Sequence, residues 1–364
     1  MIITHGMSQK VQQQEAIQDT TIVDTDVHLS VPAEEVAKYT DEPYRSHMSN
    51  TGYAPLPASG WDRNLGGKIE HYSVRSPEDV QQRLCEEFQI DYPILNATSK
   101  LPRLPQTDLA VNLMSAYNDL LIDQYLDEYD HFYGLASLAT QKPDKAAEEL
   151  DRLGDEDQIV GAYIATTGPN PPLGDPEYDI LYKAAQDNDL HVAYHGSGGA
   201  FMFEFPRQNQ SFEKFIEVHT MAHTWSQMMT LCSLLVHGVP EKFPDLNFTF
   251  LEAGVGWIPM MMFRLNKEYS IRRSEAPLLE KSPEEYIREF YFASQPIGES
   301  NDPKHMQQLI EIVGVDALTF SSDYPHWDFD HPDALEQYMT STFDEEGRQK
   351  VMYKNASNAF GLDL

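Results

Sequence analysis

The chain has 364 residues, and its 58 acidic side chains outnumber the 26 of Lys and Arg, which gives a formal net charge of −32. This balance excludes a nucleic-acid-binding protein, because binding a polyanion needs a basic surface that this sequence does not supply. With 41% hydrophobic and 11% aromatic residues, the chain can bury a large core and is not a disordered acidic tail. The length allows two or three domains, or one large α/β barrel.

The excess of acidic side chains fits either a solvated acidic surface or adaptation to a salty (halophilic) cytoplasm, where counter-ions screen the repulsion. We favour the second interpretation. The two cysteines, Cys85 and Cys232, predict neither a disulfide framework nor a thiolate zinc site. Residues 1–20 form a polar, Gln-rich extension without an apolar segment of signal-peptide or membrane-spanning length, so we expect a cytoplasmic protein with no membrane partner.

Over residues 21–364, short apolar runs of strand-forming residues alternate with longer amphipathic segments, as in repeated βαβ units. The expected strands cover residues 21–29, 89–95, 132–138, 159–164, 191–195, 247–252, 291–295 and 317–323. The expected helices include residues 77–87, 107–128, 142–153, 176–188, 212–238 and 303–313. Eight strands, each followed by helical sequence, predict a single α/β domain, a (β/α)8 TIM barrel with its active site at the carboxyl ends of the strands.

An open doubly wound sheet is the alternative, but it would normally have a Gly-x-Gly-x-x-Gly turn after the first strand, where this sequence has Asp26-Val27-His28. Residues 31–76 show no clear period and are rich in aromatic side chains. We interpret them as a long insertion after the first strand that lies over the mouth of the barrel. Residues 196–211, rich in Gly and Phe, predict a second mouth loop.

Asp26 and His28 are the strongest local signal for chemistry, because residues two apart on a strand point to the same side and can bind one ion. His195 ends the fifth expected strand, and Asp323 ends the eighth. In a barrel these four side chains would meet at one face and offer nitrogen and oxygen ligands, which suits one divalent Zn or Mn ion. The alternative is that His195 is a hydrogen-bonded barrel histidine and Asp323 a helix cap.

Three segments are characteristic in combination with these four residues: LNFTFLEAGVGWIP (246–259), FSSDYPHWD (320–328) and NASNAFGL (355–362). They resemble the amidohydrolase superfamily, and more narrowly the amidohydrolase-related branch that contains aminocarboxymuconate semialdehyde decarboxylase, γ-resorcylate decarboxylase and 5-carboxyvanillate decarboxylase. The resemblance extends from Thr21 to Leu364. It implies that Asp26, His28, His195 and Asp323 bind one Zn or Mn ion, that the substrate is a small-molecule carboxylate, and that the protein is a homodimer.

Two positions depart from the common pattern of this branch. The first-strand pair begins with Asp26, where many members have His, which weakens the case for zinc relative to manganese. Glu252 follows the sixth strand, where a catalytic His is common. His219 and His223, four residues apart and so on one helix face, are candidates to replace that imidazole, whereas a zinc-binding role for this pair is the weaker interpretation.

A divalent ion in such a site supports two reactions. Activated water gives hydrolysis of a lactone, ester or amide, with Asp323 as the proton carrier. Alternatively, chelation of a carboxylate and a neighbouring hydroxyl, with protonation of the ring by Asp323 or a nearby His, gives non-oxidative decarboxylation. A third hypothesis is a barrel that has lost catalysis and acts as a binding protein, but the intact set of four ligands argues against it.

We place decarboxylation of a small aromatic or unsaturated carboxylic acid first, because the resemblance and the aromatic mouth both favour it. We predict a catalytic role for Asp323, His223 and Glu252. The side chains predicted to bind the substrate, by stacking, hydrogen bonding or pairing with its carboxylate, are Arg63, Trp61, Phe203, His219 and His326.

Overall fold

The computed structural model describes residues 20–51, 74–96, 101, 104–196, 207, 209–297, 302–331 and 343–364. Eight parallel strands form one sheet in which each strand pairs with its neighbours in sequence. They are β1 (Val23–His28), β2 (Tyr92–Asn96), β3 (Tyr133–Ser137), β4 (Ile159–Ala165), β5 (His191–His195), β6 (Phe248–Leu251), β7 (Tyr291–Ala293) and β8 (Leu318–Thr319). The predicted (β/α)8 barrel is confirmed.

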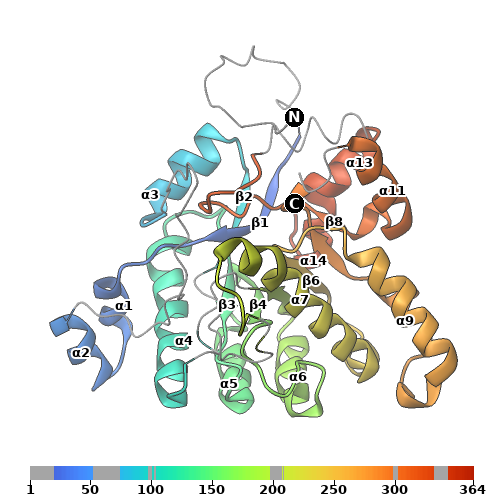
Figure 1. Ribbon diagram of the computed structural model, residues 1–364. Coiled ribbons are helices and arrows are strands. Elements are labelled where there is room, and N and C mark those ends of the chain that lie inside the picture. Colours follow the sequence, from blue (N-terminus) through green and yellow to red (C-terminus); the bar gives the residue numbers. More distant parts are fainter. Residues whose placement is uncertain are drawn as a thin grey trace.

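Helices cover the outside of the sheet, and Figure 1 shows α4, α5 and α6 side by side around it. The α-helices are α1 (Ala33–Tyr39), α2 (Tyr44–Thr51), α3 (Pro77–Val80), α4 (Thr107–Leu121), α5 (Pro143–Leu153), α6 (Asp179–Asp187), α7 (Phe215–Val236), α8 (Val239–Lys242), α9 (Ile258–Arg272), α10 (Pro283–Ile287), α11 (Pro303–Val313), α13 (Glu345–Gln349) and α14 (Asn355–Phe360). Short π-helical segments continue some of them: η1 (Gln81–Glu87), η3 (Ile122–Leu126) and η8 (Lys350–Lys354). The 3-10 turns are η4 (Pro176–Tyr178), η5 (Arg273–Glu275) and η7 (Val315–Ala317).

The core has two layers, as expected for a barrel whose interior is filled by side chains. Inside the barrel, an apolar cluster combines inward-facing strand residues such as Val23, Ile94 and Leu251 with Phe360 of α14. A larger cluster lies between the strands and the surrounding helices. Because β4 is buried along its whole length, its sequence IVGAYIA is continuously apolar rather than alternating, which is typical of strands in parallel sheets.

The eighth strand differs most from its predicted range. The sequence predicts residues 317–323, but only Leu318 and Thr319 pair with β7. The following residues turn to β1 instead: Thr25 N donates to Phe320 O (3.1 Å), and Asp323 N donates to Asp26 O (3.1 Å). These bonds close the barrel and bring the end of the eighth unit against the end of the first.

The predicted insertion at 31–76 is only partly within the described residues. Its first part forms α1 and α2, although the sequence showed no helical period, and α1 packs against α4. Residues 52–73 lie outside the described residues, so the position of the insertion over the barrel mouth stays a prediction. The N-terminal extension falls outside them as well, except for Thr20.

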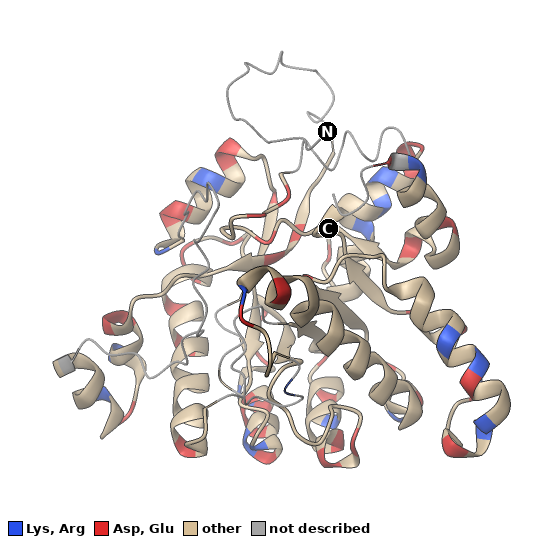
Figure 2. Ribbon diagram, viewed as in Figure 1, with Lys and Arg blue, Asp and Glu red and all other residues tan. Residues whose placement is uncertain are grey.

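Asp and Glu occur on many of the surface helices, as Figure 2 shows. Within the described ranges, no helix is both long enough and apolar enough to span a membrane. Cys85 and Cys232 are both free thiols.

Candidate metal centre

Five side chains from four separate units of the barrel converge at the carboxyl ends of the strands. Asp26 and His28 come from β1, His195 ends β5, Glu252 follows β6, and Asp323 follows β8. Each offers one ligand atom, and these atoms all lie within 4.8 Å of one another. The structure therefore brings together the four predicted metal ligands and adds Glu252 to them.

The distances within the cluster are those of groups that share one centre. His28 Nε2 lies 3.1 Å from Asp323 Oδ1 and 3.4 Å from Asp26 Oδ1. His195 Nε2 lies 2.8 Å from Glu252 Oε2 and 3.6 Å from Asp26 Oδ2. Three carboxylates and two imidazoles this close, at a buried position, repel one another unless bound protons or a cation offset the negative charge of the acids.

Unpartnered polar atoms in the cluster test whether a metal ion fits. Among the described residues, one atom of each side chain is buried without a hydrogen-bond partner of normal geometry: Asp26 Oδ2, His28 Nε2, His195 Nε2, Glu252 Oε2 and Asp323 Oδ2. Buried polar atoms are rarely left in this state. A divalent ion coordinated by nitrogen and oxygen would satisfy all five atoms, so the residues present fit such an ion.

Outer partners hold the other atoms of these side chains. Asn96 Nδ2 donates to Asp26 Oδ1 (2.6 Å), and His223 Nδ1 lies 2.9 Å from Glu252 Oε1. His195 Nδ1 lies 2.5 Å from Gly196 O. With its proton on Nδ1, His195 presents Nε2 to the cluster as a free acceptor. Contacts of this kind fix the orientation of ligands before an ion binds.

Two of the five residues have a backbone conformation that side chains rarely adopt. The φ angles of Glu252 and Asp323 are 49° and 61°. This left-handed conformation costs about 1–3 kcal/mol for a residue other than Gly. Glu252 directly follows β6, and Asp323 lies four residues after β8, in the segment that turns to β1.

Two of the carboxyl groups hold protons more strongly than usual. Burial raises the pKa of Asp26 to about 7. Burial, together with the negative charges of Glu252 and Asp26, raises the pKa of Asp323 well above its ordinary value. The opposite shift occurs at His28, whose pKa is lowered well below its ordinary value by burial and by the neighbouring imidazoles.

Glu252 and His195 favour their charged forms. Burial would raise the pKa of Glu252, but the imidazoles of His223 and His195 outweigh it and hold that pKa well below the ordinary value. Burial would likewise lower the pKa of His195, but the carboxylates of Asp26 and Glu252 raise it to about 9. Without an ion, the cluster at neutral pH therefore stores protons on groups that an ion would bind.

We expect Mn2+ binding to the metal-free protein to release protons, because ligands must lose them first. The relevant pKa values are about 7 for Asp26 and about 9 for His195. The apparent affinity should therefore rise as the pH is raised from about 6 to about 9, by about tenfold per pH unit for each proton displaced. Calorimetric titration in buffers of different ionisation enthalpy measures the released protons, and an affinity that stays constant over this range would contradict the expectation.

Gly196 allows α7 to lie close to the end of β5. A Cβ atom at this position would be 2.7 Å from His223 Cα and 3.1 Å from His223 Cβ. We expect Gly196→Ala to move α7 outward and to weaken the contact between His223 and Glu252, with a loss of about 1–3 kcal/mol in the free energy of unfolding. Urea unfolding and kcat measured on the same preparation check this, and a variant as stable and active as the parent protein would refute the assigned packing.

The remaining predicted site residues lie at different distances from the cluster. His326 is close: its Nδ1 lies 2.6 Å from Asp323 Oδ1, and its ring centroid lies 4.4 Å from that of His28. His219 lies farther out, with Nε2 3.4 Å from Asp328 Oδ2 and its ring near Trp327. Arg63, Trp61 and Phe203 lie outside the described residues.

Asn96 and Asp24 are contributors that the sequence analysis missed. Asn96 ends β2 and stands in register with His28. A polar residue at the end of the second strand was the feature of the sequence from which its role could have been predicted. Asp24 Oδ1 accepts hydrogen bonds from Asp26 N (3.2 Å) and Ser322 N (2.9 Å). It thereby ties the end of β1 to the segment that carries Asp323. Burial raises the pKa of Asp24 to about 6.

Comparisons with known proteins agree with this architecture. The gamma-resorcylate decarboxylase of Rhodococcus jostii strain RHA1 is 26% identical over 327 residues, which are 85% of this chain and 93% of that protein. The crystal structure of an amidohydrolase from Mycobacterium avium subsp. paratuberculosis K-10 matches with a TM-score of 0.76 at 18% identity, over 94% of this chain and 100% of that one. A dihydroxybenzoic acid decarboxylase from Polaromonas sp. JS666, with bound manganese and the inhibitor 2-nitroresorcinol, matches with a TM-score of 0.69 at 18% identity, over 95% of this chain and 98% of that one.

The two structural matches concern the fold alone. The family is shown by the sequence itself, because a family model described as amidohydrolase matches residues 23–362. This range begins with β1 and ends just after α14. It therefore includes every strand of the barrel and all five residues of the cluster, and the chain belongs to the amidohydrolase family.

Proposed function

We propose that this protein is a metal-dependent carboxy-lyase that removes CO2 from a small aromatic carboxylic acid with a hydroxyl group next to the carboxylate. The observation that carries the proposal is the buried cluster of Asp26, His28, His195, Glu252 and Asp323, whose unpartnered atoms point to one centre. The chain is similar in sequence to a gamma-resorcylate decarboxylase over 93% of that enzyme, which supports the same reaction class. The manganese and 2-nitroresorcinol in the Polaromonas enzyme support an ion and a ring with neighbouring oxygen substituents.

The ion that best suits these ligands is manganese, with zinc as the alternative. Three carboxylates and no thiolate form the harder type of site that manganese accepts readily. Asp26, His28, His195 and Asp323 would hold the ion, and Glu252 is placed to join them. When bound, the ion would supply a Lewis acid that holds the carboxylate of the substrate and its neighbouring hydroxyl.

Asp323 is the group that we assign to proton transfer. In decarboxylation the bond between the ring and the carboxylate carbon breaks, its electron pair stays on the ring carbon, and a proton takes the place of the departing CO2. Asp323 Oδ2 is buried in the cluster without a hydrogen-bond partner among the described residues, while Oδ1 lies 3.1 Å from His28 Nε2 and 2.6 Å from His326 Nδ1. The His326 side chain is 37% exposed, so it can return a proton from solvent to Asp323 after each turnover.

Glu252 and His223 would act as a pair. Their contact keeps Glu252 ionised and fixes the carboxylate that also faces His195. We assign His219 and His326 to the substrate side of the site, because both lie at the mouth beyond the cluster. The predicted roles of Arg63, Trp61 and Phe203 in binding the substrate, and a cytoplasmic location, remain proposals from the sequence.

The test is decarboxylation of 2,6-dihydroxybenzoate by the manganese-loaded protein. NMR of the ring protons monitors the conversion of the acid. Benzoate is the matched control, because it has the same ring and carboxylate but no neighbouring hydroxyl for two-point chelation. We expect turnover of the first acid and none of the second. Esters and lactones are assayed in parallel. Hydrolysis of either, together with no CO2 release from a panel of hydroxybenzoates, would overturn the assignment in favour of a hydrolase.

A further inference from the structure

Three buried polar side chains lie on the side of α7 that faces the strands. They are His223, Ser226 and Gln227. Residues three and four apart lie on one side of a helix, so these side chains form a short polar row, which we call the inner row of α7. Buried polar groups in proteins are almost always hydrogen-bonded. The partners of the inner row therefore indicate its role.

The side-chain amide of Gln227 bridges two neighbouring strands. Its Nε2 donates to Tyr194 O of β5 (3.3 Å) and to Leu251 O of β6. An amide NH2 group has two hydrogen atoms to donate, so each carbonyl oxygen can receive one of them. Tyr194 directly precedes His195, and Leu251 directly precedes Glu252. Gln227 thus binds the main chain one residue before each of two members of the metal cluster.

The other two members of the inner row contact the same strand ends. His223 Nδ1 lies 3.0 Å from the carbonyl oxygen of Glu252 and 2.9 Å from Oε1 of that residue. Thr166 connects Ser226 with the end of β5, because its Oγ1 lies 2.8 Å from Ser226 Oγ and its backbone N donates to His195 O (2.9 Å). The inner row therefore holds the ends of β5 and β6 against one helix.

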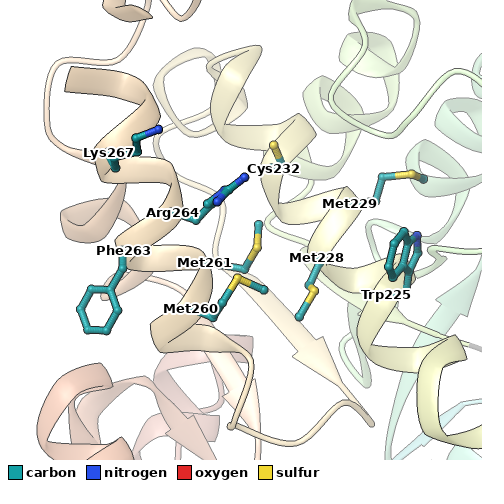
Figure 3. Close-up of a pocket in the computed structure, with 9 residues that line it drawn as sticks. All are labelled: Trp225, Met228, Met229, Cys232, Met260, Met261, Phe263, Arg264 and Lys267. Carbon is teal, nitrogen blue, oxygen red and sulfur yellow. The ribbon is translucent and has the colours of Figure 1, made fainter. Parts of the chain in front are cut away.

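A cleft borders this part of α7 on the side toward α9. It has a volume of about 870 Å3 and is lined by residues of both helices. Figure 3 shows Met228 and Cys232 of α7 on one side of it and Met261 of α9 on the other. Met228 directly follows Gln227, so the cleft lies beside the turn that carries the bridge. At this level the hydrogen bonds to the strands, more than packing against α9, set the distance between α7 and the cluster.

We propose that Gln227 is a positioning residue that sets the separation of His195 and Glu252, and with it the geometry of the metal centre. These two side chains contact each other, with His195 Nε2 2.8 Å from Glu252 Oε2. The register of β5 and β6 ends with the pair of His195 and Leu251, and Glu252 has already left the strand conformation with its φ of 49°. The Gln227 bridge ties the two main chains at this end. The inference rests on the metal centre of the proposed function.

The first test uses Gln227→Met, which has an unbranched side chain of similar size but no N–H donors. In the full-length, metal-free protein, hydrogen exchange followed by mass spectrometry should be about tenfold faster over residues 191–196 and 249–254, because two hydrogen bonds that hold these strand ends are lost. Residues 133–137 of β3 should exchange at the parent rate. Thr230→Val is the matched control, since Thr230 is equally buried on α7, and it should exchange like the parent in all three segments.

The second readout is the binding of Mn2+ to the same proteins. Gln227→Met should raise the Kd by about 10–100-fold and change the EPR spectrum of the bound ion, which reports the arrangement of its ligands. Thr230→Val should keep the Kd and the spectrum of the parent. If Gln227→Met does not fold, Gln227→Asn takes its place. Asn keeps the amide but is one methylene shorter, which withdraws the donors from the two carbonyls, so the same changes are expected.

Three outcomes would overturn the proposal. They are parent-like exchange in a folded Gln227 variant, a parent-like Kd and EPR spectrum, and faster exchange in every segment, because the last would indicate a general loss of stability. If the parent protein itself binds no Mn2+, the proposed function fails. The exchange measurement then decides by itself whether Gln227 ties the ends of β5 and β6 together.

Discussion

Replacing Asp323 by Asn should lower kcat severely and leave the ion in place. The substitution keeps the size of the side chain and one oxygen for the ion, but an amide cannot give a proton to the ring carbon. Loss of a positioned proton donor costs roughly 10²–10⁴-fold in rate, and we expect a fall of about 10³-fold in kcat. The measurement is CO2 release under saturating substrate, with metal content determined by elemental analysis on the same sample.

Asp316→Asn is the matched control for this substitution. Asp316 is an exposed residue of η7 that pairs with Lys350 on the surface, so the same chemical change there should leave kcat unchanged. A variant of Asp323 that retains full activity would show that another group delivers the proton. A variant that loses both activity and metal would show that Asp323 acts mainly as a ligand, and the proton donor would then have to be sought among His326 and His223.

Much of the fold could be predicted because local signals and global pattern agree. β5 and α11 have the predicted bounds, His191–His195 and Pro303–Val313. Gly196 directly follows β5. Asp302 caps α11, Pro303 lies in its first turn, and Gly314 follows its last residue. The range of β8 could not be predicted, because residues 320–323 follow the strand with no Gly or Pro to mark its end. Their partner, β1, lies almost 300 residues away in the sequence.

The cluster was predictable where it followed from strand ends. Asp26, His28, His195 and Asp323 are polar residues at the carboxyl ends of three apolar runs, and barrel geometry brings such ends together. The ligand position of Glu252 was not predictable in this way. Its side chain faces His195 because the backbone at Glu252 has a φ of 49°, and nothing in the composition of the segment indicates that turn.

The outer contacts were hidden for a different reason. Asn96 reaches Asp26 only because β1 and β2 pair in a register that sets it opposite His28. Asp24 connects two segments nearly 300 residues apart through backbone N–H groups. Such contacts depend on register and main-chain position, whereas the sequence shows only residue types and spacing. The sequence therefore predicted four of the five residues of the cluster as ligands, but it did not predict the hydrogen bonds that orient their side chains.

Removing one imidazole should remove the ion. In His195→Ala the cluster loses the nitrogen that lies 2.8 Å from Glu252 Oε2 and 3.6 Å from Asp26 Oδ2. Three carboxylates then repel one another with less positive charge between them. Changes even to outer contacts weaken metal binding by about 10–100-fold, and loss of a ligand should cost at least about 100-fold. We expect His195→Ala and His28→Ala to be purified without the metal that the parent protein retains, and to lack activity.

Thermal unfolding with and without Mn2+ provides a readout independent of activity. An ion that binds only the folded chain stabilises it by about 2.7 kcal/mol at 100 times its Kd, so the parent protein should unfold at a higher temperature with Mn2+, and the two variants should not at the same concentration. His305→Ala, at an exposed position on α11, is the matched control and should respond like the parent. If His195→Ala bound one ion per chain and showed the same thermal shift as the parent, the cluster would not be the binding site. The reason is that His195 Nε2 lies close to both Asp26 and Glu252, so an ion in the cluster would have to contact it.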